Sequence, residues 1–258
     1  MGLRELGLAA ILLSAAGCTQ SQETRVEAHI VDHYKRGMEL EAIAEQQTDE
    51  QARKQLFKQA LNEFELAQTD KPIDSELKQA YCLSQLGDVV KAIDLADKVI
   101  RQEPSNLAFY VRGLIKQHKG WHAMAISDFD KSIEIKDEAL ARCARYNSYM
   151  AFSVKVDEII VDGVQKALTD INKYIEMKKE EPDGYLYRYT TLSALAYANQ
   201  DKEKVREACE SLGTAFKLID SGKPLVHRDL QQAEQLFRSI YSQLQKELEP
   251  KKEPKKEY

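Results

Sequence analysis

The stretch AIDLADKVIRQEP, residues 92–104, has the pattern of a helix that keeps small residues on one face and stops at a proline. Ala92 and Ala96 are four residues apart, Val99 follows three residues later, and Pro104 comes twelve residues after the start. Residues at spacings of three and four lie on the same face of a helix. Because proline cannot continue a helix, the stretch predicts a helix with a closely packed face and a defined end.

The same pattern recurs at four other places in the chain. It begins at Ala60, Ala125, Ala167 and Ala208, in the stretches ALNEFELAQTDKP, AISDFDKSIEIKD, ALTDINKYIEMKK and ACESLGTAFKLID, and the last two are weaker copies. The leading alanines are 32, 33, 42 and 41 residues apart. A period of this size predicts a solenoid, because a single helical unit cannot bury its apolar face and stacked units can.

The composition is that of a helical globular protein. The chain has 258 residues, of which 43% are hydrophobic and 31% charged, which is enough for one or two domains. Its net charge of −5 lacks the basic footprint of a nucleic-acid-binding protein, so we expect no nucleic-acid partner. No stretch is long and apolar enough to span a bilayer, which takes about 20 residues.

The first eighteen residues, MGLRELGLAAILLSAAGC, differ from the rest of the chain. They contain an early arginine, an apolar run and small residues before a cysteine, which is the layout of a secretory signal. An amphipathic first helix is the alternative. The ending SAAGC resembles the lipobox of bacterial lipoproteins. That resemblance implies a signal peptide at residues 1–17, a lipid such as palmitate on Cys18, and a polar tether to residue 27. With Thr19 next, it also implies the periplasmic face of the outer membrane.

The stop and cap signals predict helices in pairs. Gly87 and Gly120 stand between helices, Pro104 stands after one, and Ser105 before another. TDEQ at residues 48–51 has the pattern of a capping box, and EIIVDG at residues 158–163 has that of a break. The expected helices are 26–47, the helix carrying Ala60, 75–86, 89–102, 106–119, 121–135, 164–179, 183–199, 202–219 and 225–248. The charged tail, 249–258, has no apolar content and is expected to be disordered.

Two stretches carry a resemblance to the tetratricopeptide repeat (TPR). In KQAYCLSQLGDVVKAIDLADKVIRQEP and FYVRGLIKQHKGWHAMAISDFDKSIEI, small, aromatic and proline residues fall in the slots of that family. These residues are Ala80, Leu83, Gly87, Ala92, Ala96, Pro104, Gly113, Gly120, Ala125 and Phe129. The resemblance implies an all-α, right-handed α-solenoid: about five helix–turn–helix repeats over residues 28–220, followed by a C-terminal capping helix within 221–248.

The family's concave binding groove is lined by the first helix of each repeat. By slot matching, the resemblance implies a partner-binding groove of Tyr34, Met38, Leu77, Tyr81, Tyr110, Leu114 and Gln117. For any one of these residues, the alternative to partner binding is a role in core packing. Tyr81 and Tyr110 are the stronger candidates, because tyrosine is a frequent interface anchor. Leu77 and Tyr81 occupy two slots of the polar clamp of chaperone-tail readers, which argues against that function.

The remaining reactive residues favour ordinary structural roles. Cys82, Cys143 and Cys209 lack metal-site spacing, and we expect buried thiols, with a disulfide left open. His29 and His33 are four residues apart and could share a metal, whereas His118 and His122 flank a glycine. Surface histidines are the favoured interpretation. The carboxylates of Asp128 and Asp130 lie on different faces of a helix, so they form no acid/base pair.

The sequence therefore favours a binding protein over an enzyme. GxSxG, P-loop, HExxH and GxGxxG motifs are all absent, so we expect no catalytic residue, metal or cofactor. The expected function is a lipid-anchored periplasmic scaffold or adaptor that binds partner proteins in envelope assembly. Pilus or secretion machinery and the recruitment of cell-wall hydrolases are the processes that the resemblance implies. The alternatives are a cell-wall-processing enzyme or metal-binding envelope protein that uses the paired histidines, and a purely structural subunit of an envelope machine.

Overall fold

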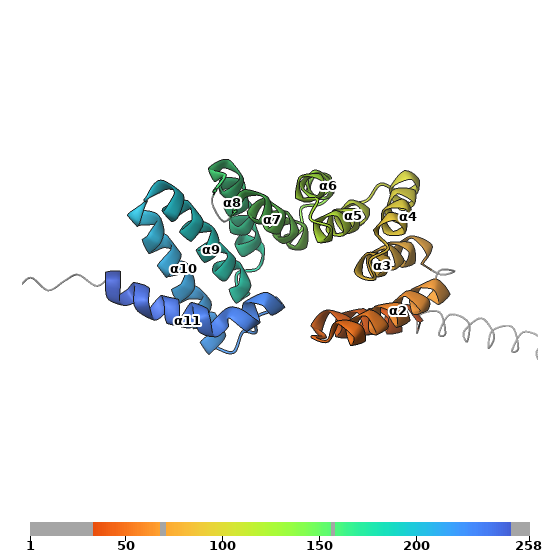
Figure 1. Cartoon of the computed structure of the whole chain (residues 1–258), viewed down its shortest axis with the longest axis horizontal. Helices are drawn as coiled ribbons and strands as arrows, with labels where there is room; N and C mark the ends of the chain where they lie inside the picture. The colour runs from red at the N-terminus through yellow and green to blue at the C-terminus, as the bar shows by residue number, and fades with distance from the viewer. Residues whose placement is uncertain (1–32, 68–70, 156–157, 249–258) are drawn as a thin grey trace, which may run out of the picture. The chain divides into compact units, whose positions relative to one another are not determined.

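A computed structural model describes residues 33–67, 71–155 and 158–248 (Figure 1). The regular structure in these residues is helical, apart from one isolated antiparallel bridge between Val154 and Ile159. The chain divides into two compact units, residues 1–104 and 105–258. Helices follow one another in pairs within each unit.

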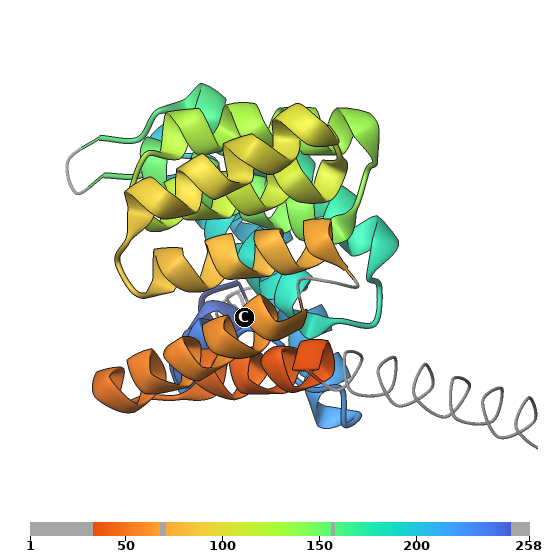
Figure 2. The same ribbon diagram turned by 90° about the vertical axis from the view of Figure 1, so that its right-hand side faces the viewer.

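The described residues of the first unit form four helical segments. They are the helix over 33–46, α2 (Glu50–Leu66), α3 (Pro72–Gln85) and α4 (Val89–Gln102). α2 packs on α3, and α3 packs on α4; the turned view of Figure 2 shows α3 and α4 side by side. Phe57, Phe64, Ala44, Ala60 and Cys82 form a core cluster with no exposed surface.

In the second unit, the part that the structure describes forms three helix pairs and a final helix. They are α5 (Asn106–His118), α6 (His122–Ile135), α7 (Ala139–Ser153), α8 (Val161–Met177), α9 (Pro182–Asn199), α10 (Lys202–Asp220) and α11 (Arg228–Leu248). Each helix packs on the next one in the chain. α11 packs against α10 and buries Leu230 and Phe237, while Leu236 and Leu248 stay exposed.

The alanine pattern is confirmed as the centre of the helix packing. Ala60, Ala92, Ala125, Ala167 and Ala208 all have 0% exposure. Two glycines also allow paired helices to approach closely. A Cβ atom on Gly113 would lie 2.5 Å from the Phe129 ring, and one on Gly37 would lie 2.6 Å from the Phe64 ring. Small residues on one helix therefore admit the aromatic rings of its partner.

The predicted turns at Gly87 and Gly120 are confirmed. Both glycines have positive φ, +93° and +78°, a conformation that a side chain makes costly. Ser105 caps α5 as predicted, with its Oγ accepting the N–H of Ala108 at 3.2 Å. Local sequence signals therefore identify the ends of α3 and α4 and the start of α5.

Three predicted helix starts are wrong. The cap of α2 is Asp49 rather than Thr48, because the Asp49 carboxylate accepts the N–H of Ala52 at 2.7 Å. α3 begins at Pro72, whose missing N–H is harmless in a first turn. α8 begins at Val161, so the connection between α7 and α8 is residues 154–160. The described ends of this connection extend away from the helices in Figure 2.

One further helix start differs from the prediction. The last helix begins at Arg228 rather than Leu225, because the preceding residues bind Asp183. Among the described residues, none of the helices has the length and apolar character needed to cross a membrane.

Candidate functional site

The predicted groove residues of the first unit differ in exposure. Tyr34 and Tyr81 are half-buried, and their rings pack edge-on against Phe64 and Phe57, at centroid distances of 5.6 and 6.2 Å. Met38 is 38% exposed, whereas Leu77 is 1% exposed and belongs to the core. Leu77 is therefore unavailable to a partner in this fold.

Polar contacts join the first helices of the first unit. The Tyr81 hydroxyl donates to Glu45 at 2.9 Å, and Lys78 donates to Glu41 at 2.8 Å. Burial raises the pKa of Glu41, and the ammonium of Lys78 opposes this shift. Burial and then the charges of nearby carboxylates also raise the pKa of Tyr34. The Tyr34 hydroxyl therefore keeps its proton near neutral pH, and the Tyr81 hydroxyl donates to the exposed carboxylate of Glu45.

The predicted residues of the second unit lie on α5. Tyr110 and Leu114 are half-buried against the cluster of Ala125, Phe129 and Ala144. Gln117 donates to the carbonyl of Ala144 at 2.7 Å and to the hydroxyl of Ser148 at 2.8 Å. Gln117 therefore ties the first helix of one pair to the first helix of the next. Because Tyr81 belongs to the other unit, the single groove containing Tyr81 and Tyr110 stays a prediction.

Sequence reasoning missed a carboxylate that recurs three residues after the leading alanine in three of the helix pairs, partly buried in the first and buried in the other two. In the first pair, Glu63 accepts from His33 at 2.6 Å and lies 3.8 Å from Arg36. In the third pair, Asp128 is 2% exposed and lies 2.5 Å from Arg112 and 2.6 Å from Lys116. The acidic residue three positions after the leading alanine was the sequence signal that could have predicted these ion pairs.

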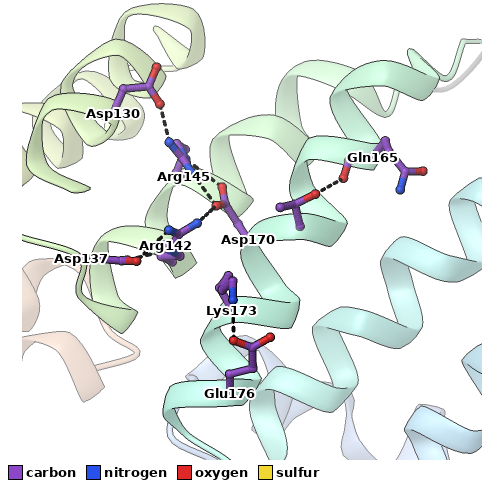
Figure 3. A network of polar contacts seen from close by, with 9 residues as sticks. Asp130, Asp137, Arg142, Arg145, Gln165, Asp170, Lys173 and Glu176 are labelled. Atoms are coloured by element: carbon purple, nitrogen blue, oxygen red, sulfur yellow. Dashed lines mark hydrogen bonds and ion pairs between the residues drawn. The ribbon is translucent and has the colours of Figure 1, made fainter. Parts of the chain in front are cut away.

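The fourth pair has the most extended version of this arrangement (Figure 3). Asp170, 1% exposed, accepts hydrogen bonds from Arg142 at 3.0 Å and from Arg145 at 2.8 and 2.6 Å. Arg142 also donates to Asp137, and Arg145 also donates to the exposed Asp130. The two arginines of α7 therefore fix α8 through one buried carboxylate.

Asp128 and Asp130 confirm the prediction that they do not form a pair. Asp128 is buried beneath α5, whereas Asp130 is exposed and contacts α7. Their carboxylates serve two different helix contacts. This part of α6 therefore has a packing role.

Only one histidine of the first spaced pair lies among the described residues. His33 binds Glu63, and His29 lies outside the described residues. His118 ends α5 and His122 begins α6, so the two belong to different helices as expected. Across the described ranges, no group of three or more His, Cys, Asp or Glu residues could hold a metal ion. The three described cysteines are free and buried, as predicted.

An apolar surface at the start of α6 was also missed. Trp121, Met124 and Phe152 are 44%, 53% and 45% exposed, and with His122 they line a hollow of about 400 Å³. Trp121, directly after the turn at Gly120, was the sequence signal that could have predicted this apolar surface. Cys18, the predicted lipid site, lies outside the described residues, as does the tail 249–258.

Solved structures with the same fold are tetratricopeptide-repeat proteins and their relatives. TTC0263 of Thermus thermophilus, described as a thermophilic TPR protein, matches with a TM-score of 0.54 at 14% identity, over 84% of this chain and 98% of that one. Yeast Tom70 gives 0.64 at 12% identity, over 88% of this chain and 42% of that one. MamA of Desulfovibrio magneticus RS-1 gives 0.51 at 15% identity, over 73% and 98%.

No protein-family profile matches the chain, and no curated protein sequence matches it significantly. The structural matches and the paired helices show an all-α chain with the tetratricopeptide-repeat fold.

Proposed function

We propose that the chain is a lipid-anchored scaffold that binds partner proteins through the first helices of its repeats. The observation that carries this proposal is the state of Tyr34, Tyr81 and Tyr110. Each is half-buried on a first helix, with its ring packed on an aromatic core residue. A ring held in this way loses little side-chain entropy when it binds a partner.

The neighbouring side chains favour a peptide or helix as the bound segment. Met38 offers a flexible apolar contact, and Glu45 offers an exposed carboxylate on the same helix. With Tyr81, which donates to Glu45, these residues form the first-unit strip. Methionine adapts to different apolar partners. A segment that combines apolar anchors with a basic residue would match this strip.

The cellular setting of the proposal comes from the N-terminal segment. SAAGC and Thr19 support lipid attachment at Cys18 and a position on the periplasmic face of the outer membrane. The partners would then belong to envelope assembly: pilus or secretion machinery, or cell-wall hydrolases. The scaffold would hold them at the membrane.

The test begins with photocrosslinking from position 38, which identifies the segment that contacts this strip. Binding of that segment is then measured for Tyr81→Ala and Tyr110→Ala. We expect each substitution to weaken binding by about 2 kcal/mol, roughly 30-fold, because truncated interface anchors have this effect. The free energy of unfolding, measured in urea, should change much less than for a core tyrosine.

Two tyrosines provide matched controls. Tyr174 is 2% exposed, so Tyr174→Ala should destabilise the fold by about 3–5 kcal/mol, as a core cavity does. Tyr197 is 81% exposed, so Tyr197→Ala should change neither stability nor binding. If Tyr81→Ala and Tyr110→Ala behave like Tyr174→Ala, both residues are core residues and the proposed binding surface is wrong.

A further inference from the structure

One of the three buried cysteines has an environment unlike the other two. Burial raises the pKa of the thiols of Cys82 and Cys209, which keeps both protonated near neutral pH. Cys143, 3% exposed on α7, lies beside an imidazole instead: its Sγ is 3.8 Å from Nε2 of His227. Cys143, His227 and the side chains around them all belong to the second unit.

A buried carboxylate holds that imidazole in position. Asp183, in the first turn of α9, has no exposed surface, and its Oδ1 lies 2.8 Å from Nδ1 of His227. The same carboxylate accepts the backbone N–H groups of Val226 and His227, at 3.0 and 2.6 Å. Three donors thus fix the segment before α11, and Nε2 is directed at the sulfur.

The sulfur, imidazole and carboxylate form a chain of proton partners. Burial lowers the pKa of His227, but its hydrogen bonds to Asp183 and Cys143 outweigh burial and raise the pKa to about 10. The imidazole is therefore a cation near neutral pH. The other ionisable groups around the pair are Tyr146 on α7, Tyr174 on α8, Tyr187 on α9 and Asp229 on α11. The Tyr187 ring packs edge-on against the imidazole at 5.4 Å.

We propose that Cys143 is a redox modification site, a reactive thiol that small neutral peroxides convert to the sulfenic acid. A cysteine beside an imidazolium that a carboxylate orients has the arrangement that activates thiolate nucleophiles. Because Cys143 is 3% exposed, the reagent must be small and uncharged, and hydrogen peroxide meets both conditions. Larger disulfides are excluded by the same burial.

The reaction balances with the groups present. The Cys143 thiolate attacks one peroxide oxygen, an S–O bond forms, and the O–O bond breaks. The sulfur is oxidised by two electrons to the sulfenic acid, and the departing hydroxide is the reduced product. His227 gives its Nε2 proton to that hydroxide, which leaves as water. Asp183 acts through His227 and is a positioning residue.

The test measures all three thiols in the full chain. The protein is exposed to hydrogen peroxide for set times, treated with catalase, and denatured in dimedone and iodoacetamide. Peptide mass spectrometry then gives the rate of sulfenic-acid formation at each cysteine. We expect Cys143 to react at least ten-fold faster than Cys82 and Cys209 at pH 7. The Cys143 rate should exceed the rate at Cys209 even though Cys209 is the more exposed of the two thiols, at 9% against 3%.

Two variants test the role of the partners. In His227→Gln and Asp183→Asn, the Cys143 rate at pH 7 should fall at least ten-fold. The direction of the change distinguishes lost activation from greater exposure of the thiol, because exposure alone would raise the rate. Equal rates at the three cysteines of the unmodified chain would overturn the proposal. An unchanged Cys143 rate in folded His227→Gln would overturn it as well.

Discussion

Small residues decide where the helices of this chain can approach one another. The five leading alanines were predicted from their spacing alone, and all five are fully buried. The prediction succeeded because a close helix crossing needs a small side chain at a fixed position, and that need is visible in one sequence. Gly113 has the same role against Phe129.

Enlarging one of these alanines should destabilise the fold. Ala125→Leu adds three carbon atoms to a fully buried position on α6, so we expect a loss of about 1–3 kcal/mol in the free energy of unfolding. Ala123→Leu, at an exposed position of the same helix, should change it by less than about 0.5 kcal/mol. Urea denaturation of both variants checks this, and equal stabilities would show that the assigned packing face is wrong.

At the scale of the element, helix ends with local chemical signals were predicted and ends set by packing were not. α4 has its predicted bounds, Val89–Gln102, because a glycine precedes it and a proline follows it. α8 begins earlier than EIIVDG suggests, since Gly163 and Val164 are buried in its first turns. Tertiary burial outweighed the local pattern there.

The carboxylate between α7 and α8 offers a test of element packing. Asp170→Asn removes the buried charge that Arg142 and Arg145 share, so two largely buried guanidinium groups keep only the more exposed Asp137 and Asp130 as partners. We expect a loss of about 3–5 kcal/mol in the free energy of unfolding, as for other broken buried ion pairs. Asp162→Asn is the matched control on the same helix, because Asp162 is exposed and pairs with exposed Lys166. It should change stability by less than about 1 kcal/mol.

The attachment of the segment before α11 should depend on pH. The folded-state pKa of His227, about 10, exceeds its ordinary value of 6.5, so its contribution is complete below 6.5 and is lost as the pH rises through 10. The lowered pKa of Asp183 preserves that contribution down to acidic pH. We expect His227→Gln to destabilise the chain by about 2 kcal/mol at pH 6 and by much less at pH 10.

The control for that measurement is an exposed residue of α11 that does not titrate. Leu236→Ala, at a position that is 62% exposed, should show the same small difference from the unmodified chain at both pH values. A His227→Gln effect that does not decrease between pH 6 and pH 10 would contradict the assigned ion pair.

At the scale of the whole molecule, the fold was predictable and the contacts between distant residues were not. The repeat period and the stop signals indicate stacked helix pairs without any structural information. Cys143, Asp183 and His227 carry no such signal, because Cys143 and His227 are 84 residues apart and meet through the stacking of α7, α9 and the start of α11. The prediction that Leu77 contacts a partner did not hold for a related reason. Slot matching assigns a residue to a helix face, but it does not determine how far the side chain is buried.

The proposed membrane attachment makes a prediction for the whole chain. Cys18→Ser should abolish fatty-acid incorporation in metabolic labelling, because the thiol that carries the lipid is gone. The protein should then leave the membrane fraction or remain uncleaved. Cys82→Ser, which changes a cysteine of the folded region, should leave labelling intact. Unchanged incorporation in Cys18→Ser would contradict the lipid site.

The recurring carboxylate has a consequence for how such a gene can change. Glu63, Asp128 and Asp170 each find cationic partners on the other helix of their own pair. A duplication that copies a whole pair therefore brings the carboxylate together with its cationic partners. A crossover within a pair separates the acid from its base and leaves a buried charge alone. We expect insertions and deletions of repeats among descendants of this gene to have their breakpoints between pairs, and chimeras joined within a pair to fold poorly.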